Sequence, residues 1–135
     1  MTTKIFVNLP VKNLNRSKEF FTRLGYEFNL QFTDETAACM VVSDVIYVML
    51  LTEVKFKEFT PKEICDARKS TEVLVCLSYE SRDRVNELVN KAVAGGATTY
   101  AEPKDYGFMY QHGFQDLDGH IWELIYIEPG AIKQG

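Results

Sequence analysis

One order of helix and strand signals occurs twice along this chain, and that repeat constrains the fold more than any other feature of the sequence. In the first copy, alternating apolar residues over 5–11 predict a strand, and an apolar stripe over 17–24 predicts a helix. Gly25 suits the left-handed position that ends a helix. Three short strands are then expected, over 27–32, 37–42 and 45–51.

The second copy repeats the same order of signals. Residues 72–79 are apolar and β-branched, as in a strand, and Ser81 can cap the helix that follows. The apolar stripe of that helix ends at Gly95-Gly96. Three strands are expected after it, over 98–101, 109–115 and 120–127.

Two copies of this unit predict an α+β fold. We expect two tandem βαβββ modules that form a curved mixed sheet, a saddle or half-barrel, with the helices on its convex side. Residues 1–135 should form a single domain, with repeat 1 over about 4–52, a charged linker over 53–71 and repeat 2 over about 72–128. Within the linker, Thr60-Pro61 can start one helical turn.

The predicted fold has a consequence for ligand binding. Each copy is too small to bury its sheet alone, so the two copies should pack together. The concave face of the resulting sheet can hold a ligand. The alternative is a filled core without a pocket.

The composition argues against several classes of partner. The 15 Lys and Arg against 19 Asp and Glu give a net charge of −4, so we expect neither nucleic acid nor a membrane surface as partner. The longest apolar run, 45–51, is too short to span a membrane. The three cysteines, Cys39, Cys65 and Cys76, have no metal-binding or redox spacing, and no apolar signal segment is recognisable. These features favour reduced thiols and a cytoplasmic location.

Three motifs lie in order on the repeated frame. The first, at 9–26, reads L-x-V-x-N-L-x-x-S-x-x-F-F followed by L-G-Y. The second runs from Ser81 to Gly96, and the third, at 114–124, reads F-Q-D-L-D-G-H-x-W-E-L. Together they resemble the vicinal oxygen chelate superfamily, which includes glyoxalase I, bleomycin resistance proteins, fosfomycin resistance enzymes and extradiol dioxygenases. The resemblance covers roughly residues 4 to 129.

The resemblance implies a divalent metal in the concave cavity, held by His, Glu or Gln from the first and last strands of each repeat. By this resemblance the four ligand positions fall at Phe6, at Leu74, near Met49 and at Glu123. Phe and Leu have no donor atom, and Met is a soft ligand that suits these metals poorly. One carboxylate cannot hold a divalent ion against competition from water, so no metal cofactor is expected.

Glu123 then needs another partner, because burying an unpaired carboxylate is costly. If the turn over 116–119 contributes two or four loop residues, His112 shares a face of the sheet with Glu123, and Tyr110 and Phe114 follow by parity. A three-residue loop would put His112 on the opposite face. The His112–Glu123 pair could bind the polar end of a ligand or act as a general acid and base. Its alternative is a structural hydrogen bond.

Three functions remain open from the sequence. The leading hypothesis is metal-independent binding of a small molecule, as in bleomycin resistance proteins. The alternative is a lyase or other enzyme of the glyoxalase type that uses Glu123, with or without a divalent metal. The third is a purely structural dimer module, and the resemblance implies a homodimer in any case. The candidate lining residues are Phe6, Asn8, Pro10, Met49, Leu74, Cys76, Tyr110, Phe114 and Glu123.

Overall fold

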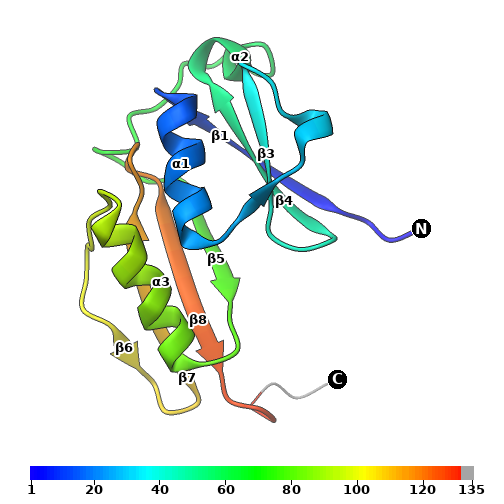
Figure 1. Cartoon of the computed structure of the whole chain (residues 1–135). Coiled ribbons are helices and arrows are strands. Elements are labelled where there is room, and N and C mark those ends of the chain that lie inside the picture. Colours follow the sequence, from blue (N-terminus) through cyan, green and yellow to red (C-terminus); the bar gives the residue numbers. More distant parts are fainter. Residues whose placement is uncertain (132–135) are drawn as a thin grey trace. The chain divides into compact units, whose positions relative to one another are not determined.

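The computed structural model describes residues 1–131, which divide into two compact units (Figure 1). The first module comprises residues 1–65 and the second module begins at residue 66. Each module contains one four-stranded sheet and one long helix.

The first module is built on a mixed sheet in the order β1-β4-β3-β2. β1 and β4 pair in parallel, whereas the β4–β3 and β3–β2 pairs are antiparallel. Its elements are β1 (Ile5–Val11), α1 (Leu14–Leu24), β2 (Glu27–Phe28), the 3₁₀ turn η1 (Leu30–Phe32), β3 (Ala37–Val41), β4 (Ile46–Thr52) and α2 (Glu53–Lys57).

The second module repeats this arrangement, with the sheet order β5-β8-β7-β6. β5 and β8 are parallel, and the other two pairs are antiparallel. Its elements are β5 (Leu74–Ser78), α3 (Arg82–Ala94), β6 (Lys104–Asp105), β7 (Met109–Gln115) and β8 (Ile121–Ile127). The predicted α+β class and the two tandem βαβββ modules are therefore confirmed.

Equivalent caps begin the two long helices. The Asn13 side chain accepts a hydrogen bond from the Arg16 amide at 3.1 Å, and the Ser81 hydroxyl accepts one from the Arg84 amide at 3.0 Å. Each bond satisfies an amide that the helix leaves without a partner. Gly25 ends α1 with φ of 108°, the left-handed conformation that the sequence predicts for it.

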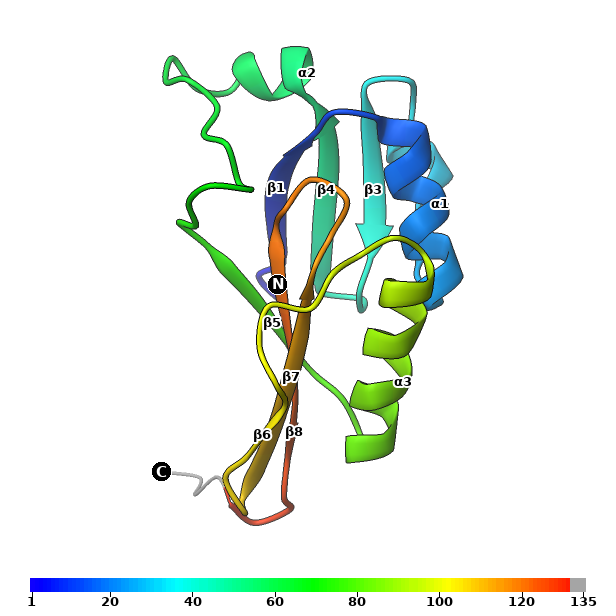
Figure 2. The ribbon, with the colours of Figure 1, turned by 90° about the vertical axis from the view of Figure 1, so that its left-hand side faces the viewer.

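Each long helix covers one face of its own sheet (Figure 2). In the first module, Phe20, Phe21 and Leu24 of α1 are buried on the sheet side, and Val48 and Leu50 of β4 are fully buried with them. The second module buries its own apolar layer under α3. Its members are Val85, Leu88, Val89, Ala92, Phe114, Trp122 and Leu124.

Trp122 organises the core of the second module. Its ring is stacked on that of Phe114, with 6.4 Å between the ring centroids, and both side chains are 1% exposed. Its indole Nε1 donates a hydrogen bond to the buried carboxylate of Asp116 at 3.0 Å. That carboxylate also accepts from the amides of Asp118 and His120, so the last hairpin is tied to the core.

Two expected strands are not formed as predicted. The strand over 27–32 is only two residues long, because the Asn29 side chain accepts from the Gln31 amide and starts η1. The segment 98–101 is not a strand: Thr98 makes one bridge to Gln115, and the edge strand is β6 instead.

The helical turn expected at Thr60-Pro61 is also misplaced. The linker helix is α2, capped by the Thr52 hydroxyl through the Lys55 amide at 3.2 Å. Thr60 accepts from the Lys62 amide in a local turn that does not continue into a helix. Over residues 1–131, no helix is long and apolar enough to cross a membrane.

Candidate functional site

The two modules place equivalent residues at equivalent positions. Phe6 lies eight residues before the start of α1, and Leu74 lies eight residues before the start of α3. The strand registers agree with this spacing, because Asn8 pairs with Met49 just as Cys76 pairs with Glu123. Met49 therefore occupies the position in the first module that Glu123 occupies in the second.

These residues lie on the faces of the two sheets that point away from the long helices, which we call the helix-distal faces. On the first of them, Phe6 and Tyr47 are register partners, and their rings stack at 4.8 Å with an interplanar angle of 11°. Phe6 is 52% exposed. Lys4 Nζ lies 5.7 Å from the Tyr47 ring. This face offers an aromatic surface beside Asn8, whose side chain is exposed.

The helix-distal face of the second module carries the carboxylate of Glu123. Its side chain is half-buried, and Gln111 Nε2 donates a hydrogen bond to its Oε2. Gln111 lies on β7 opposite Ile125, so it shares a face with Glu123 by the alternation of the strand. Leu74 is 52% exposed at the start of β5 and belongs to the same face.

Gly113 makes room for a phenol beside that carboxylate. It is the direct register partner of Glu123. A Cβ atom at this position would lie 2.5 Å from the Tyr100 hydroxyl oxygen and 2.5 Å from the Trp122 carbonyl oxygen. Both distances are too short for any real side chain, so only glycine lets the Tyr100 ring lie here.

The negative charge of Glu123 acts on two neighbouring groups. Cys76 is solvent-accessible, yet adjacent groups desolvate its sulfur and raise the pKa of the thiol, and the charge of Glu123 raises it further. Burial, followed by the charges of Glu123 and Cys76, raises the pKa of the Tyr100 phenol. Both groups are therefore protonated at neutral pH and can donate hydrogen bonds. We call Cys76, Tyr100, Gln111 and Glu123 the carboxylate cluster.

The predicted pairing of His112 with Glu123 is wrong. Five loop residues, 116–120, separate the paired residues Gln115 and Ile121, so His112 lies opposite Leu124. An odd loop length puts His112 on the face that α3 covers. There its Nδ1 is buried without a hydrogen-bond partner among residues 1–131, and burial lowers the pKa of the imidazole.

Tyr110 and Phe114 follow His112 to the helix side. The Tyr110 hydroxyl donates to Asn86 Oδ1 of α3 at 2.7 Å, and Phe114 is fully buried in the core. The sequence predicted that both residues would line the ligand site, but neither lies on the helix-distal face that carries the carboxylate cluster. Their expected roles in ligand binding thus lack the predicted geometry.

Sequence reasoning did not single out Tyr100, Gln111 or Gly113. The signal for Gln111 and Gly113 was present, because an odd hairpin loop places both on the face of Glu123. Tyr100 lies in an irregular segment, where no strand alternation indicates the direction of a side chain.

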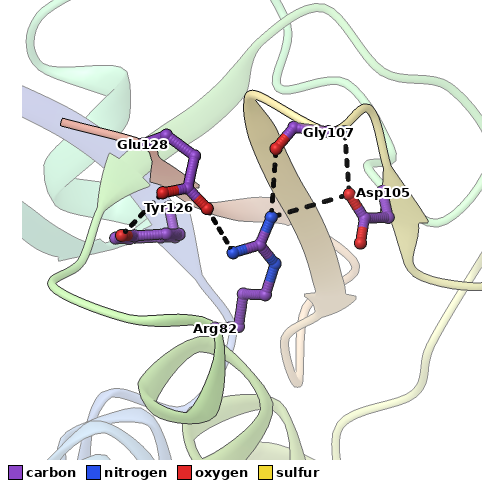
Figure 3. A network of polar contacts seen from close by, with 5 residues as sticks. All are labelled: Arg82, Asp105, Gly107, Tyr126 and Glu128. Atoms are coloured by element: carbon purple, nitrogen blue, oxygen red, sulfur yellow. Dashed lines mark hydrogen bonds and ion pairs between the residues drawn. The ribbon is translucent and has the colours of Figure 1, made fainter. Parts of the chain in front are cut away.

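A second polar network lies at the other end of the second module (Figure 3). Arg82 Nη1 donates to Glu128 Oε1 at 2.6 Å, and Nη2 donates to the Gly107 carbonyl at 3.2 Å. The same guanidinium is 3.7 Å from Asp105 and lies over the Tyr126 ring. Arg82 thus ties the start of α3 to the β6–β7 hairpin and to the end of β8.

The four ligand-equivalent positions and the rest of the described chain offer few atoms that could bind a divalent metal. Within residues 1–131, no group of three or more His, Cys, Asp and Glu side chains is arranged to hold an ion. Of the four ligand-equivalent positions, Phe6 and Leu74 offer no donor, Met49 offers a thioether, and Glu123 shares its carboxylate with Gln111. Metal sites of this class need several oxygen or nitrogen ligands.

A surface groove of about 720 Å³ lies on the first module between α1 and η1. Lys18, Glu19 and Arg23 mix both signs of charge along it, beside Phe28 and Leu30. It lies on the helix side of the sheet and contains none of the predicted site residues.

Comparison with known proteins gives a family match for part of the chain. The family described as bleomycin resistance protein-like N-terminal matches residues 3–43. Comparison with curated proteins gives no match.

Solved structures match over nearly the whole chain. A hypothetical protein from S. aureus is 26% identical, with a TM-score of 0.78 over 93% of this chain and 95% of that chain. A glyoxalase/bleomycin resistance protein/dioxygenase family enzyme from Burkholderia phytofirmans PsJN is 14% identical, with a TM-score of 0.79 over 93% and 99%. The fosfomycin resistance protein FosX from Listeria monocytogenes is 16% identical, with a TM-score of 0.65 over 93% of each chain.

The repeated βαβββ modules and these matches define the class: the chain has the fold of the vicinal oxygen chelate superfamily, as its motifs predicted. More narrowly, its first module is similar to the N-terminal part of bleomycin resistance protein-like chains.

Proposed function

We propose that this protein binds a small organic molecule on the helix-distal face of a module without using a divalent metal. The observation that carries the proposal is the apolar character and the exposure of two ligand-equivalent positions. Phe6 and Leu74 are each 52% exposed, although each belongs to a regular strand of a folded sheet. Exposed apolar side chains at a position where the fold family has metal ligands favour contact with an apolar ligand.

The surroundings of these two residues support the same proposal. The stacked rings of Phe6 and Tyr47 offer a flat surface for an aromatic or aliphatic group. In the second module, the carboxylate cluster offers polar groups that can orient a ligand. A mainly apolar site with a few fixed polar groups is typical of small-molecule binding sites.

A ligand screen on metal-free protein tests the proposal. Protein treated with EDTA is mixed with metabolite-like and drug-like compounds, and its unfolding temperature is measured. We expect binders with an apolar body to raise this temperature, because a ligand that binds only the native state stabilises it by about 2.7 kcal/mol at 100 times its Kd.

Two variants make the test specific. Leu74→Ser should weaken any binder that contacts the second module. Leu30→Ser removes an even more exposed apolar side chain on η1, on the helix side, and should leave binding unchanged. A screen without any stabiliser, or binders equally weakened by both variants, would contradict the proposal.

A second candidate is an enzyme of the glyoxalase type, such as a lyase, that uses Glu123. It is favoured by the phenol of Tyr100 beside the Glu123 carboxylate. A protonated phenol and an ionised carboxylate can act as an acid and a base on one substrate. If turnover of any substrate is found, Glu123→Gln should abolish it while folding is retained, and Tyr100→Phe should lower kcat.

A further inference from the structure

We propose that the carboxylate cluster recognises an organic ammonium group, so that a protonated amine lies where the fold family would have a metal ion. This inference rests on the proposed small-molecule binding and names the class of ligand. It is carried by the geometry around Glu123, taken in three steps.

The first step is that no cationic side chain among residues 1–131 forms an ion pair with Glu123. Six ion pairs occur in the part of the chain that the structure describes, and none of them involves Glu123. The two arginines of α3 in these pairs, Arg82 and Arg84, contact other carboxylates. Within the described part of the chain, Gln111 is the one hydrogen-bond donor to Glu123, and its amide is neutral, so this half-buried carboxylate attracts a cation and repels an anion.

The second step concerns hydrogen-bond direction. Gln111 Nε2 donates to Glu123, which leaves the Gln111 amide oxygen as an acceptor on the same face. The Tyr100 hydroxyl oxygen, which Gly113 admits beside Glu123, can also accept a hydrogen bond. An ammonium group has three donors and no acceptor, so it matches a carboxylate, an amide oxygen and a hydroxyl oxygen.

The third step distinguishes an organic ammonium from a bare cation. A divalent ion needs several charged or strongly polar ligands, and the cluster supplies a single carboxylate. Around that carboxylate, Leu74 is exposed, and Ile121 and Ile125 lie on the same face of β8. This apolar margin can contact the carbon body of an amine, which a hydrated metal ion lacks.

The experiment compares three probes of similar shape and different charge on the full chain after treatment with EDTA. Benzylamine is a cation at neutral pH, benzyl alcohol is neutral, and phenylacetate is an anion. Binding is followed by titration of the amide signals of ¹⁵N-labelled protein. We expect benzylamine to shift the signals of Gln111, Gly113 and Glu123, and to bind at least about 10-fold tighter than benzyl alcohol, a difference of about 1.4 kcal/mol.

Three variants test whether the preference for benzylamine depends on the carboxylate cluster. Glu123→Gln keeps the shape of the side chain and removes its charge, and it should reduce the affinity for benzylamine to that for benzyl alcohol. Glu63→Gln removes an exposed carboxylate from the first module and should change nothing. Tyr100→Phe, which removes only the hydroxyl, should weaken benzylamine severalfold and gives a second test if Glu123→Gln does not fold.

The outcomes separate this inference from the proposed function. Equal affinity for benzylamine and benzyl alcohol, or benzylamine binding that survives Glu123→Gln, would overturn the ammonium site and leave apolar ligand binding standing. Absence of any binding by all three probes and by the wider compound screen would overturn both.

Discussion

Gly113 and Glu123 together determine which polar groups lie on the helix-distal face of the second module. Glu123 supplies a charge, and the missing side chain of Gly113 supplies the space through which Tyr100 approaches that charge. The same charge raises the pKa values of Tyr100 and Cys76, so that it holds two protonated groups beside it. At the scale of residues, the cluster is therefore one coupled unit, and changes to one member should be detectable at another.

Substitution of Gly113 tests the steric part of this coupling. Gly113→Ala places a Cβ atom against the Trp122 carbonyl and the Tyr100 hydroxyl, so the strand or the phenol must move. We expect a loss of about 1–3 kcal/mol in the free energy of unfolding, as for overpacked core sites, measured by urea denaturation. An unchanged unfolding midpoint would show that Tyr100 does not lie against Gly113.

Removal of the Glu123 charge tests the electrostatic part. Burial raises the pKa of the Cys76 thiol first, and the charge of Glu123 adds to that effect. In Glu123→Gln only the burial effect remains, so the pKa of Cys76 should fall and more thiolate should be present at a given pH.

The measurement is the rate of alkylation of Cys76 by iodoacetamide as a function of pH, followed by mass spectrometry of the Cys76 peptide. In Glu123→Gln the midpoint of the rate profile should move to lower pH. Glu63→Gln is the matched control and should leave the profile in place. A profile unchanged in both variants would mean that Glu123 and Cys76 do not interact.

At the scale of elements, each module depends on contacts that begin or hold a helix. The caps of α1 and α3 use different residues for the same purpose, an amide hydrogen bond in the first turn. The Arg82 network also holds a helix in place, because it connects the first residue of α3 to Gly107 in the β6–β7 hairpin and to Glu128 after β8.

The cap of α3 gives a prediction with a built-in control. Ser81→Ala removes the acceptor for the Arg84 amide and should lower the free energy of unfolding by about 1 kcal/mol. Ser81→Asp retains an acceptor at the same place and should unfold like the unsubstituted protein in urea. Equal destabilisation by both variants would show that the hydroxyl acts through some other contact.

The Arg82 network predicts local protection of the β6–β7 hairpin. Arg82→Ala removes the contacts to Gly107 and Glu128, so the amides of Tyr106 and Glu128, which bond across the hairpin region, should exchange with solvent faster. Arg84→Ala, in the same turn of α3, removes only ion pairs to Glu80 and Glu87 and should leave those amides protected. Hydrogen exchange measured by NMR distinguishes the two variants.

At the scale of the whole molecule, the repeat could be predicted from the sequence. The face of the sheet on which the side chains of the last hairpin lie could not. The caps, the apolar stripes and the eight-residue spacing from Phe6 and Leu74 to their helices are local signals, so element order followed from them. The face of His112 depends on whether a hairpin loop has an odd or an even number of residues. In the structure the Asp116 carboxylate accepts hydrogen bonds from the amides of Asp118 and His120, and these bonds stabilise a loop of five residues.

Metal removal is the prediction that involves all four ligand-equivalent positions together. Because Glu123 is the single oxygen donor among them, treatment with EDTA should leave the unfolding temperature of purified protein unchanged in calorimetry. A bound ion present at 100 times its Kd would instead contribute about 2.7 kcal/mol. Stoichiometric metal by elemental analysis, with a lower unfolding temperature after its removal, would contradict the prediction.

The gap at Gly113 also has an evolutionary consequence. Every glycine codon is one nucleotide change away from an alanine codon, so one point mutation can close the space that Tyr100 occupies and its reversal can open it. Either change is a single substitution in the β7–β8 hairpin, although the strand or the Tyr100 phenol moves with it. Ligand preference in such a module can therefore drift between lineages while the scaffold is inherited intact.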